Sequence, residues 1–199
     1  MKIHIICVAY QRYRPLEILI HSFLVQTNPN WTLHVIHDGP APADLWDIFR
    51  LFIDGFKKDN RIHFYESEER NEKSGHPNRR MMLQKIDVDP KDFILMTNDD
   101  NYYTPRFIEY FLAKARFNTG LIYCNTLHSL TDYVIHNSTL GQGGIDMGAF
   151  IVRADIAKMT GFNHDDDQAD GFYCGECAEA CKKHDLQTIK IEKALFVHN

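Results

Sequence analysis

Apolar and polar residues follow two spacings in turn along the first 124 residues of the chain. Short apolar runs that fit buried strands are separated by stretches in which apolar residues recur every three or four positions, as on one face of a helix. The runs predicted as strands are 3–8, 33–36, 62–65, 93–96 and 121–124. Strands that alternate with helices predict an α/β fold, with a mostly parallel sheet flanked by helices on both faces.

Helices are predicted between these strands. Their apolar faces consist of Leu16, Leu19, Ile20, Phe23 and Leu24, then Leu45, Phe49, Phe52 and Phe56, then Phe107, Ile108, Phe111, Leu112 and Ala115. A further helix is predicted at about 78–86, after a polar loop at 66–77 that we expect to be mobile. Thr104 and Pro105 have the residue types of an N-cap and a first helical position, so the last helix is predicted to begin there.

The regular alternation of predicted strands and helices ends at about residue 125, and a smaller mixed part is predicted to follow. Its expected elements are a strand or hairpin arm at 131–135, a glycine-rich hinge at 140–144, a strand at 147–153, an acidic loop at 165–171, a helix at 172–184 and strand segments at 188–191 and 195–198. No internal repeat or linker interrupts the sequence. We therefore predict one domain, 1–199, with a first half at 1–124 and a second half at 125–199.

The composition is that of a globular protein. Hydrophobic residues make up 44% and charged residues 25% of the 199 positions. The net charge of −5 gives no general attraction to nucleic acid, so no nucleic-acid partner is expected. No apolar run approaches the roughly 18 residues that a transmembrane helix needs. Five cysteines, an odd number, without a secretory signal predict reduced thiols and a cytoplasmic location.

Candidate ligand-binding residues follow three of the predicted strands. Asp99 and Asp100 lie just after the strand at 93–96, and loop 10–14 and Asp38 follow two other strands. In open α/β sheets the carboxyl ends of the strands form the edge where ligands bind, so these positions are expected to meet in one crevice. Magnesium characteristically uses one or two carboxylates plus substrate phosphates. The sequence therefore predicts a site for a divalent cation and a diphosphate, with a solvated turn as the alternative for the two adjacent aspartates.

The sequence does not support three other kinds of site. No Gly-x-Gly-x-x-Gly follows the first strand, which disfavours a Rossmann dinucleotide site, and no Gly-Lys-Ser/Thr occurs, which excludes a phosphate-loop triphosphatase. Cys174, Cys177, Cys181 and His184 have a spacing that suggests zinc. On one continuous helix they form a stripe about 15 Å long, at roughly 1.5 Å per residue. Four ligands at about 2.3 Å from one ion cannot be spread that far, so a buried cysteine face is predicted.

Segment 5–38 resembles the opening of glycosyltransferase family 2, an inverting group with the GT-A fold, and the resemblance extends over essentially the whole chain. It rests on the segments 9–12 (Ala-Tyr-Gln-Arg), 26–31 (Gln-Thr-Asn-Pro-Asn-Trp) and 38–39 (Asp-Gly), and on 98–100 (Asn-Asp-Asp), which matches the family's Asp-x-Asp motif. The chain departs from the family's Pro-Thr-Tyr-Asn-Arg at Ala9 and Gln11, and from its Asp-Asp-Gly-Ser at His37 and Pro40.

This resemblance implies a nucleotide-sugar donor, by default a UDP sugar, bound by the first half. The positions that it assigns to donor binding are Tyr10, Arg12, Asp38, Arg79 and Asp99. Of these, Asp38 is expected to hydrogen-bond the base and Asp99 to contact the ribose. Arg80 fills the place of Arg79 if the register differs by one residue, and a solvated arginine at a helix start is the alternative for Arg79.

The resemblance also implies a divalent metal, Mn²⁺ or Mg²⁺. Asp100 is the position expected to ligate the ion that bridges the pyrophosphate. His198 lies where many GT-A enzymes supply a further ligand near the C-terminus, and an imidazole is compatible with manganese beside carboxylate and phosphate oxygens. The predicted metal ligands are therefore Asp100 and His198.

The catalytic base is expected in the second half, which would also hold the acceptor. The family's late Glu-Asp motif most nearly matches Ala169-Asp170, with the glutamate missing. Asp170 is therefore the predicted base, and a helix N-cap is its alternative role. Asp146, beside the glycine hinge, is the second candidate for the base or for acceptor contact.

Together these features predict an inverting, metal-dependent glycosyltransferase with an acceptor hydroxyl of undefined kind, acting in cell-surface polysaccharide or glycoconjugate synthesis. Segments 66–75 and 140–144 are candidates to close over the donor and exclude water. Because the motif glutamate is missing, a catalytically silent nucleotide-sugar-binding module is the alternative. A zinc-stabilised interaction protein built on the cysteine helix is the third interpretation.

Overall fold

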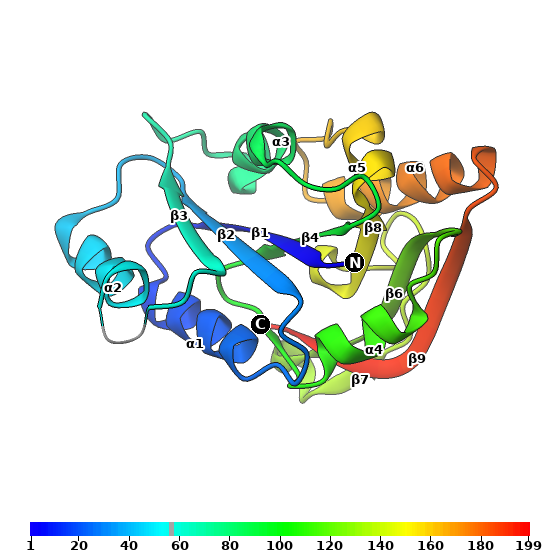
Figure 1. Ribbon diagram of the computed structural model, residues 1–199, viewed down its shortest axis with the longest axis horizontal. Coiled ribbons are helices and arrows are strands. Elements are labelled where there is room, and N and C mark those ends of the chain that lie inside the picture. The colour runs from blue at the N-terminus through cyan, green and yellow to red at the C-terminus, as the bar shows by residue number, and fades with distance from the viewer. Residues whose placement is uncertain (56–57) are drawn as a thin grey trace.

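A single large sheet crosses the protein in the computed structural model (Figure 1). The structure describes residues 1–55 and 58–199, and within these parts the sheet has nine strands in the order β3-β2-β1-β4-β8-β6-β9-β5, with β7 paired to β6. The predicted helical position Phe56 lies outside the described residues.

The first half supplies the parallel part of the sheet. Its strands are β1 (Ile3–Ala9), β2 (Trp31–His37), β3 (Ile62–Glu66) and β4 (Phe93–Asn98). All four run parallel, and every residue of β1 and β2 is buried. Burial on both faces explains why β1 and β4 consist mostly of apolar residues instead of alternating apolar and polar ones. The α/β prediction is confirmed here.

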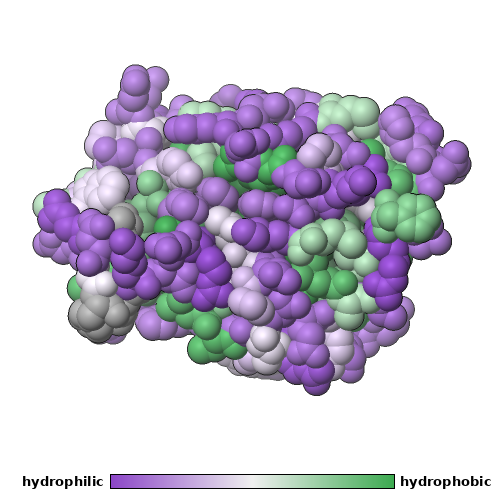
Figure 2. Space-filling view, viewed as in Figure 1, coloured by the Kyte–Doolittle hydropathy of each residue, from purple (hydrophilic) through white to green (hydrophobic). Residues whose placement is uncertain are grey.

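Helices cover both faces of the sheet, as predicted. Those that pack on one side in Figure 1 are α1 (Tyr13–Leu24), α2 (Ala43–Ile53) and α4 (Phe107–Lys114); those on the other are α3 (His76–Lys85), α5 (Ala154–Thr160) and α6 (Ala169–Lys183). Among the described residues no helix is long and apolar enough to cross a bilayer. The face in Figure 2 is largely hydrophilic, with apolar residues in separate patches, as on ordinary globular surfaces.

The predicted start of α4 at Thr104 is wrong. The helix begins at Phe107 with Arg106 as its N-cap residue. The reason is a two-residue strand, β5 (Tyr102–Tyr103), which pairs with the end of the chain, and the Thr104 N–H continues that pairing by donating to the Leu195 carbonyl at 3.0 Å. A long-range strand contact thus overrides a local capping signal.

The second half forms the mixed part of the sheet. Its strands are β6 (Thr119–His128), β7 (Val134–His136), β8 (Phe150–Arg153) and β9 (Gln187–His198), and its short helical turns are η2 (Ser129–Thr131) and η3 (Met147–Ala149). The strand predicted at 147–153 is shorter because its first three residues form η3. The two predicted tail segments are one strand, β9, which lies inside the sheet between β6 and β5.

Helix α6 carries the predicted cysteine face. It begins at Ala169, three residues before the predicted start. Cys174, Cys177 and Cys181 are all fully buried and unoxidised, so the predicted buried cysteine face is confirmed. Burial raises the pKa of Cys174 to about 12 and that of Cys181 to about 11, which keeps both thiols protonated.

Candidate active site

A cavity of about 760 Å³ opens at the carboxyl ends of β1, β2 and β4, and we call it the strand-end pocket. Its polar lining comes from the β1 loop, the end of β2, the loop before α3 and the end of β4. The residues that line it are Val8, Ala9, Tyr10, Gln11, Arg12, Asp38, Arg70, Glu72, Lys73, Ser74, Gly75, Arg79, Asn98 and Asp99. All five positions assigned from the sequence to donor binding are among them.

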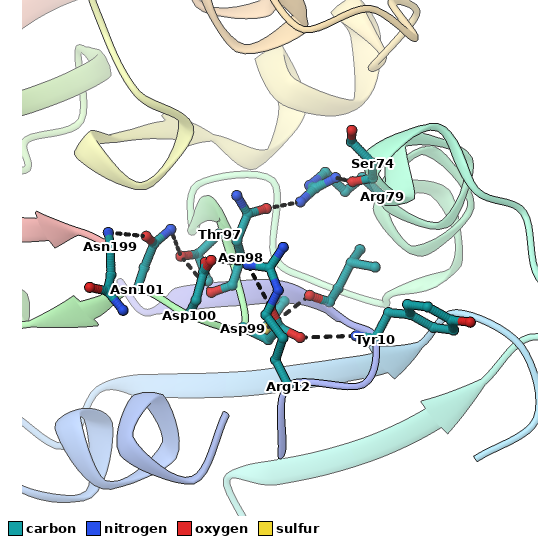
Figure 3. A network of polar contacts seen from close by, with 12 residues as sticks. Tyr10, Arg12, Ser74, Arg79, Thr97, Asn98, Asp99, Asp100, Asn101 and Asn199 are labelled. Carbon is teal, nitrogen blue, oxygen red and sulfur yellow. Dashed lines mark hydrogen bonds and ion pairs between the residues drawn. The ribbon is translucent and has the colours of Figure 1, made fainter. Parts of the chain in front are cut away.

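Asp99 fixes the loop that follows β1. Its side chain is buried, and its Oδ2 accepts a hydrogen bond from the Tyr10 backbone N–H at 2.9 Å (Figure 3). Burial raises the pKa of Asp99 above its ordinary value, and the hydrogen bond from Tyr10 acts against that rise. Asp100 points to the guanidinium of Arg12, which also lies 3.9 Å from Asp99 Oδ1. Asp100 is therefore joined to the strand-end pocket through Arg12.

Asp38 holds the loop before α3 instead of pointing freely into the pocket. Its Oδ1 accepts hydrogen bonds from the Asn71 backbone N–H at 2.8 Å and from the Asn78 side chain at 2.7 Å. Its Oδ2 accepts the Glu72 backbone N–H at 3.1 Å. The segment predicted to be a mobile loop is therefore anchored to the end of β2 by one buried carboxylate.

Unlike its alternative, Arg80, Arg79 lines the strand-end pocket. Its side chain is fully buried, donates to the Ser74 carbonyl at 2.6 Å and contacts the Asn98 side chain (Figure 3). Burial lowers the pKa of Arg79 to about 10, which leaves it charged at neutral pH. Its Nε has no hydrogen-bond partner in the described structure. Arg80 points elsewhere, to the Phe162 carbonyl.

Gly75 lets this loop cross the end of β1. Its φ is +76°, and a Cβ there would lie 2.5 Å from the side chain of Val8. Any other residue would therefore push the loop off the strand.

A second cavity of about 360 Å³, which we call the side pocket, lies over the mixed part of the sheet. Its lining is His128, His136, Ser138, Gly143, Gly144, Ile145, Asp146, Asp167, Gln168, Asp170 and Gly171. Gly171 brings two of its walls together, because a Cβ there would lie 2.6 Å from the Gln142 backbone. The glycine-rich loop therefore packs directly on the first turn of α6.

Asp170 is the second residue of α6, and its Oδ2 accepts the Met147 backbone N–H at 3.2 Å. The N-cap residue is Gln168, so the alternative of Asp170 as an N-cap is wrong. Burial raises the pKa of Asp170 above its ordinary value, and the nearby charge of Asp146 adds to the rise. A carboxylate with a raised pKa in a cavity is suited to accept a proton.

His198 lies beside the side pocket. Its Nδ1 is 3.5 Å from Asp146 Oδ1, and its ring stacks on His128, whose Nε2 is 3.0 Å from Asp146 Oδ2. Among the described residues no three His, Cys, Asp or Glu side chains are grouped so that they could hold a metal by themselves. The structure therefore places His198 with Asp146, and does not group it with Asp99 and Asp100 as ligands.

The sequence analysis assigned no role to several residues of both pockets. In the strand-end pocket, the Arg70 guanidinium lies 4.1 Å from the centre of the Tyr10 ring, and Lys73 and Asn98 line the cavity. The concentration of charge in a loop after a strand was the available signal, because binding residues are commonly on such loops. His128 in the side pocket left no comparable signal.

Solved structures that share this fold include TarS and a mannosyltransferase. TarS from S. aureus superposes with a TM-score of 0.74 at 14% identity, covering 100% of this chain and 37% of TarS. TarS 1–349 in complex with UDP-GlcNAc gives 0.71 at 14%, covering 100% and 58%. The mannosyltransferase PcManGT from Pyrobaculum calidifontis, in complex with GDP-Man and Mn²⁺, gives 0.70 at 14%, covering 99% and 56%.

These likenesses establish the fold, and the chain spans less than two thirds of each of the three structures. No curated protein matches the chain in sequence. The family model "Glycosyl transferase family 2" matches residues 4–177. The chain belongs to glycosyltransferase family 2.

Proposed function

We propose that this chain transfers a sugar from a nucleotide-diphosphate donor, by default a UDP sugar, to an acceptor hydroxyl with inversion at the sugar carbon. One observation carries the proposal: a single cavity at the strand ends is lined by Tyr10, Arg12, Asp38, Arg79 and Asp99, all assigned in advance to the donor. The TarS fragment in complex with UDP-GlcNAc and PcManGT in complex with GDP-Man agree with a donor of this class.

The strand-end pocket offers separate surfaces for the two ends of a nucleotide. Tyr10, with Arg70 stacked on its ring, provides an aromatic and cationic wall for a base. Arg12 and Arg79 provide guanidinium groups for a diphosphate, which arginine recognises well. Arg79 remains charged at neutral pH, so it contributes positive potential to the pocket even though its side chain is buried.

The residues present fit a divalent cation held jointly with a diphosphate. Asp100 is a carboxylate beside the pocket that is joined to it through Arg12, and a hard cation such as Mg²⁺ or Mn²⁺ needs only one or two carboxylates when phosphates supply the remaining oxygens. We therefore assign the metal to Asp100, with Asp99 as the neighbouring carboxylate. A bound cation would offset the negative charge that develops on the leaving diphosphate.

The side pocket is assigned to the acceptor. Asp170 accepts the proton of the acceptor hydroxyl as its oxygen attacks the sugar carbon from the face opposite the diphosphate. A new carbon–oxygen bond forms, the bond to the diphosphate breaks, and the configuration inverts. Asp170 suits this role because burial raises the pKa of its carboxyl group, whereas Asp146 already shares its oxygens with two imidazoles. A role in polysaccharide or glycoconjugate synthesis remains our proposal for the pathway.

Transfer assays test the proposal and separate it from a silent binding module. The protein is incubated with UDP and GDP sugars and a mixed panel of sugar and polyol acceptors, with and without Mn²⁺, and the products are detected by mass spectrometry. We expect a glycosylated product of inverted configuration, measured by NMR. Donor binding without either transfer or donor hydrolysis would favour the silent module, and absence of nucleotide binding would refute both.

A further inference from the structure

A lysine in the loop before α3 links the strand-end pocket to the segment that leads into α6. Lys73 lines the pocket, and its Nζ lies 2.9 Å from Asp165 Oδ2. Asp165 begins the acidic loop at 165–168, whose last two residues, Asp167 and Gln168, line the side pocket. This ion pair therefore joins a wall of one pocket to a wall of the other.

Asp165 has a second cationic partner that stays in place. Arg80, on α3, donates to Asp165 Oδ1 at 2.8 Å and to the Phe162 carbonyl at 2.7 Å. Both cations lower the pKa of Asp165, with the hydrogen bond from Lys73 as the largest cause. If Lys73 leaves, Asp165 remains paired with Arg80. Asp165 therefore keeps a cationic partner after the lysine departs.

The backbone around Lys73 is held in an unusual conformation. Glu72, Lys73 and Ser74 have φ angles of 57°, 48° and 53°, in the left-handed region that residues other than glycine rarely adopt. Asp38 and Arg79 hold this backbone from both sides, through the Glu72 N–H and the Ser74 carbonyl. The backbone is thus fixed at the pocket while the lysine side chain, 59% exposed, keeps its freedom.

Lys73 is suited to change partners when a diphosphate arrives. Its ammonium group is a point charge on a flexible stem, whereas the guanidinium of Arg79 is buried against fixed partners. An exposed ion pair such as Lys73–Asp165 is worth at most about fivefold in an equilibrium constant. A diphosphate carries more charge than one carboxylate and forms strong charge-assisted hydrogen bonds. The diphosphate therefore wins the competition for the lysine.

We propose that Lys73 exchanges Asp165 for the diphosphate of a bound nucleotide, while Arg80 keeps Asp165 in place. The inference rests on the proposed function, because it requires a nucleoside diphosphate in the strand-end pocket. In this exchange Lys73 favours donor binding, and Asp165 opposes it by competing for the lysine.

Calorimetric titration with UDP, GDP, uridine and guanosine, in the presence of Mn²⁺, tests the exchange. Lys73→Met is expected to weaken binding of the nucleoside diphosphate about tenfold, and to leave binding of the nucleoside within twofold. Asp165→Asn is expected to tighten the diphosphate two- to fivefold, because it removes the competitor. In the double variant the gain from Asp165→Asn should disappear. Lys182→Met, at an exposed lysine of α6, is the matched control.

The outcomes separate this inference from the proposed function. If the unmodified protein binds a nucleoside diphosphate and both single variants bind it equally well, the exchange is refuted and the proposed function stands. Weaker binding by Asp165→Asn also refutes the exchange, because it makes Asp165 a supporting group instead of a competitor. If the unmodified protein binds neither UDP nor GDP, both proposals fail. Melting temperatures confirm that each variant is folded.

Discussion

The strand-end pocket and the side pocket are both lined by carboxylates, but the protein holds the two sets differently. In the strand-end pocket, Asp38 accepts three hydrogen bonds and is therefore committed to shaping the wall of its pocket. Asp170 accepts one hydrogen bond, from Met147, and burial raises its pKa. Asp38 therefore holds its pocket rigid, whereas Asp170 is suited to take up a proton.

This contrast divides the proposed reaction between the pockets. A pocket whose walls are fixed before binding loses little freedom when it binds a donor, which favours affinity. A carboxylate with spare acceptor capacity and a raised pKa favours general base catalysis. Changes in the first pocket should therefore alter donor binding, whereas changes at Asp170 should alter turnover.

Asp170→Asn should have the largest effect. An asparagine cannot take up the acceptor proton, so kcat is expected to fall about 1,000-fold, within the usual range for a general base. Affinity for UDP or GDP should stay within twofold, because Asp170 does not line the strand-end pocket. Steady-state kinetics and calorimetry measure the two quantities. In the unmodified protein kcat should fall as the pH falls through the raised pKa of Asp170. The midpoint of this fall in the pH–rate profile should therefore lie above pH 3.8, the ordinary pKa of an aspartate.

Asp146→Asn is the matched control for this variant. It changes a neighbouring carboxylate of the same pocket and should retain much more activity than Asp170→Asn. If turnover is instead lost in Asp146→Asn and kept in Asp170→Asn, the base is Asp146. The contrast between Asp38 and Asp170 would then not explain the division of roles between the pockets.

Asp100→Ala should have the next largest effect, on donor binding. Loss of the proposed metal carboxylate is expected to weaken UDP or GDP binding in Mn²⁺ about 100-fold, as for roughly 3 kcal/mol of lost attraction. Without Mn²⁺ the two proteins should bind nucleotide alike. Calorimetry with and without the ion measures this difference.

His198→Gln tests whether a second protein ligand contributes. The structure pairs this imidazole with Asp146, so the variant should keep the metal-dependent part of nucleotide affinity. A loss as large as that of Asp100→Ala would instead make His198 a ligand, as the family resemblance implied.

The two pockets also differ in how far the sequence predicted them. The strand-end pocket could be predicted because apolar runs locate the parallel strands, and parallel strands place their carboxyl ends at one edge. Asp38 and Asp99 were found in this way. Their hydrogen bonds were not, because no local pattern shows that a carboxylate will accept the N–H of Glu72.

The sequence predicted less of the side pocket, because this pocket depends on pairing between strands that are far apart in the chain. His128 and His198 become neighbours only through the parallel pairing of β6 with β9, across 70 residues. The same pairing absorbed two predicted tail segments into one strand. Asp170 was assigned through the family resemblance and Asp146 by its place beside the glycine hinge, but nothing in the sequence indicated the histidine partners of Asp146.

Acidification should distinguish the histidines of the two halves. Burial lowers the pKa of His34 to about 3, and it lowers that of His4, whereas His128 lies beside the carboxylate of Asp146. Since unfolded histidine has a pKa of about 6.5, the unfolded state takes up the proton first and stability falls as the pH drops below that value. His34 alone should cost about 2 kcal/mol between pH 8 and pH 5.

Urea unfolding at pH 8 and pH 5 measures this loss in the unmodified protein and in His34→Gln. The variant should lose about 2 kcal/mol less on acidification, because glutamine does not titrate. His63→Gln is the control, since His63 is the exposed partner of His34 on the neighbouring strand. Equal acid sensitivity of all three proteins would show that His34 is not the source.

Asp38→Asn tests most directly whether the strand-end pocket is rigid before binding. The amide group cannot accept at both of its ends, so the loop loses part of its anchor, at Asn71 or at Glu72. Hydrogen bonds to a charged group are worth about 1.5–3 kcal/mol, so about tenfold weaker binding of UDP or GDP is expected. Asp47→Asn, on the exposed face of α2, should bind nucleotide normally. Hydrogen exchange of the Asn71 and Glu72 amides separates the causes: faster exchange in the variant supports a loosened loop, and unchanged exchange with weaker binding would mean that Asp38 contacts the nucleotide itself.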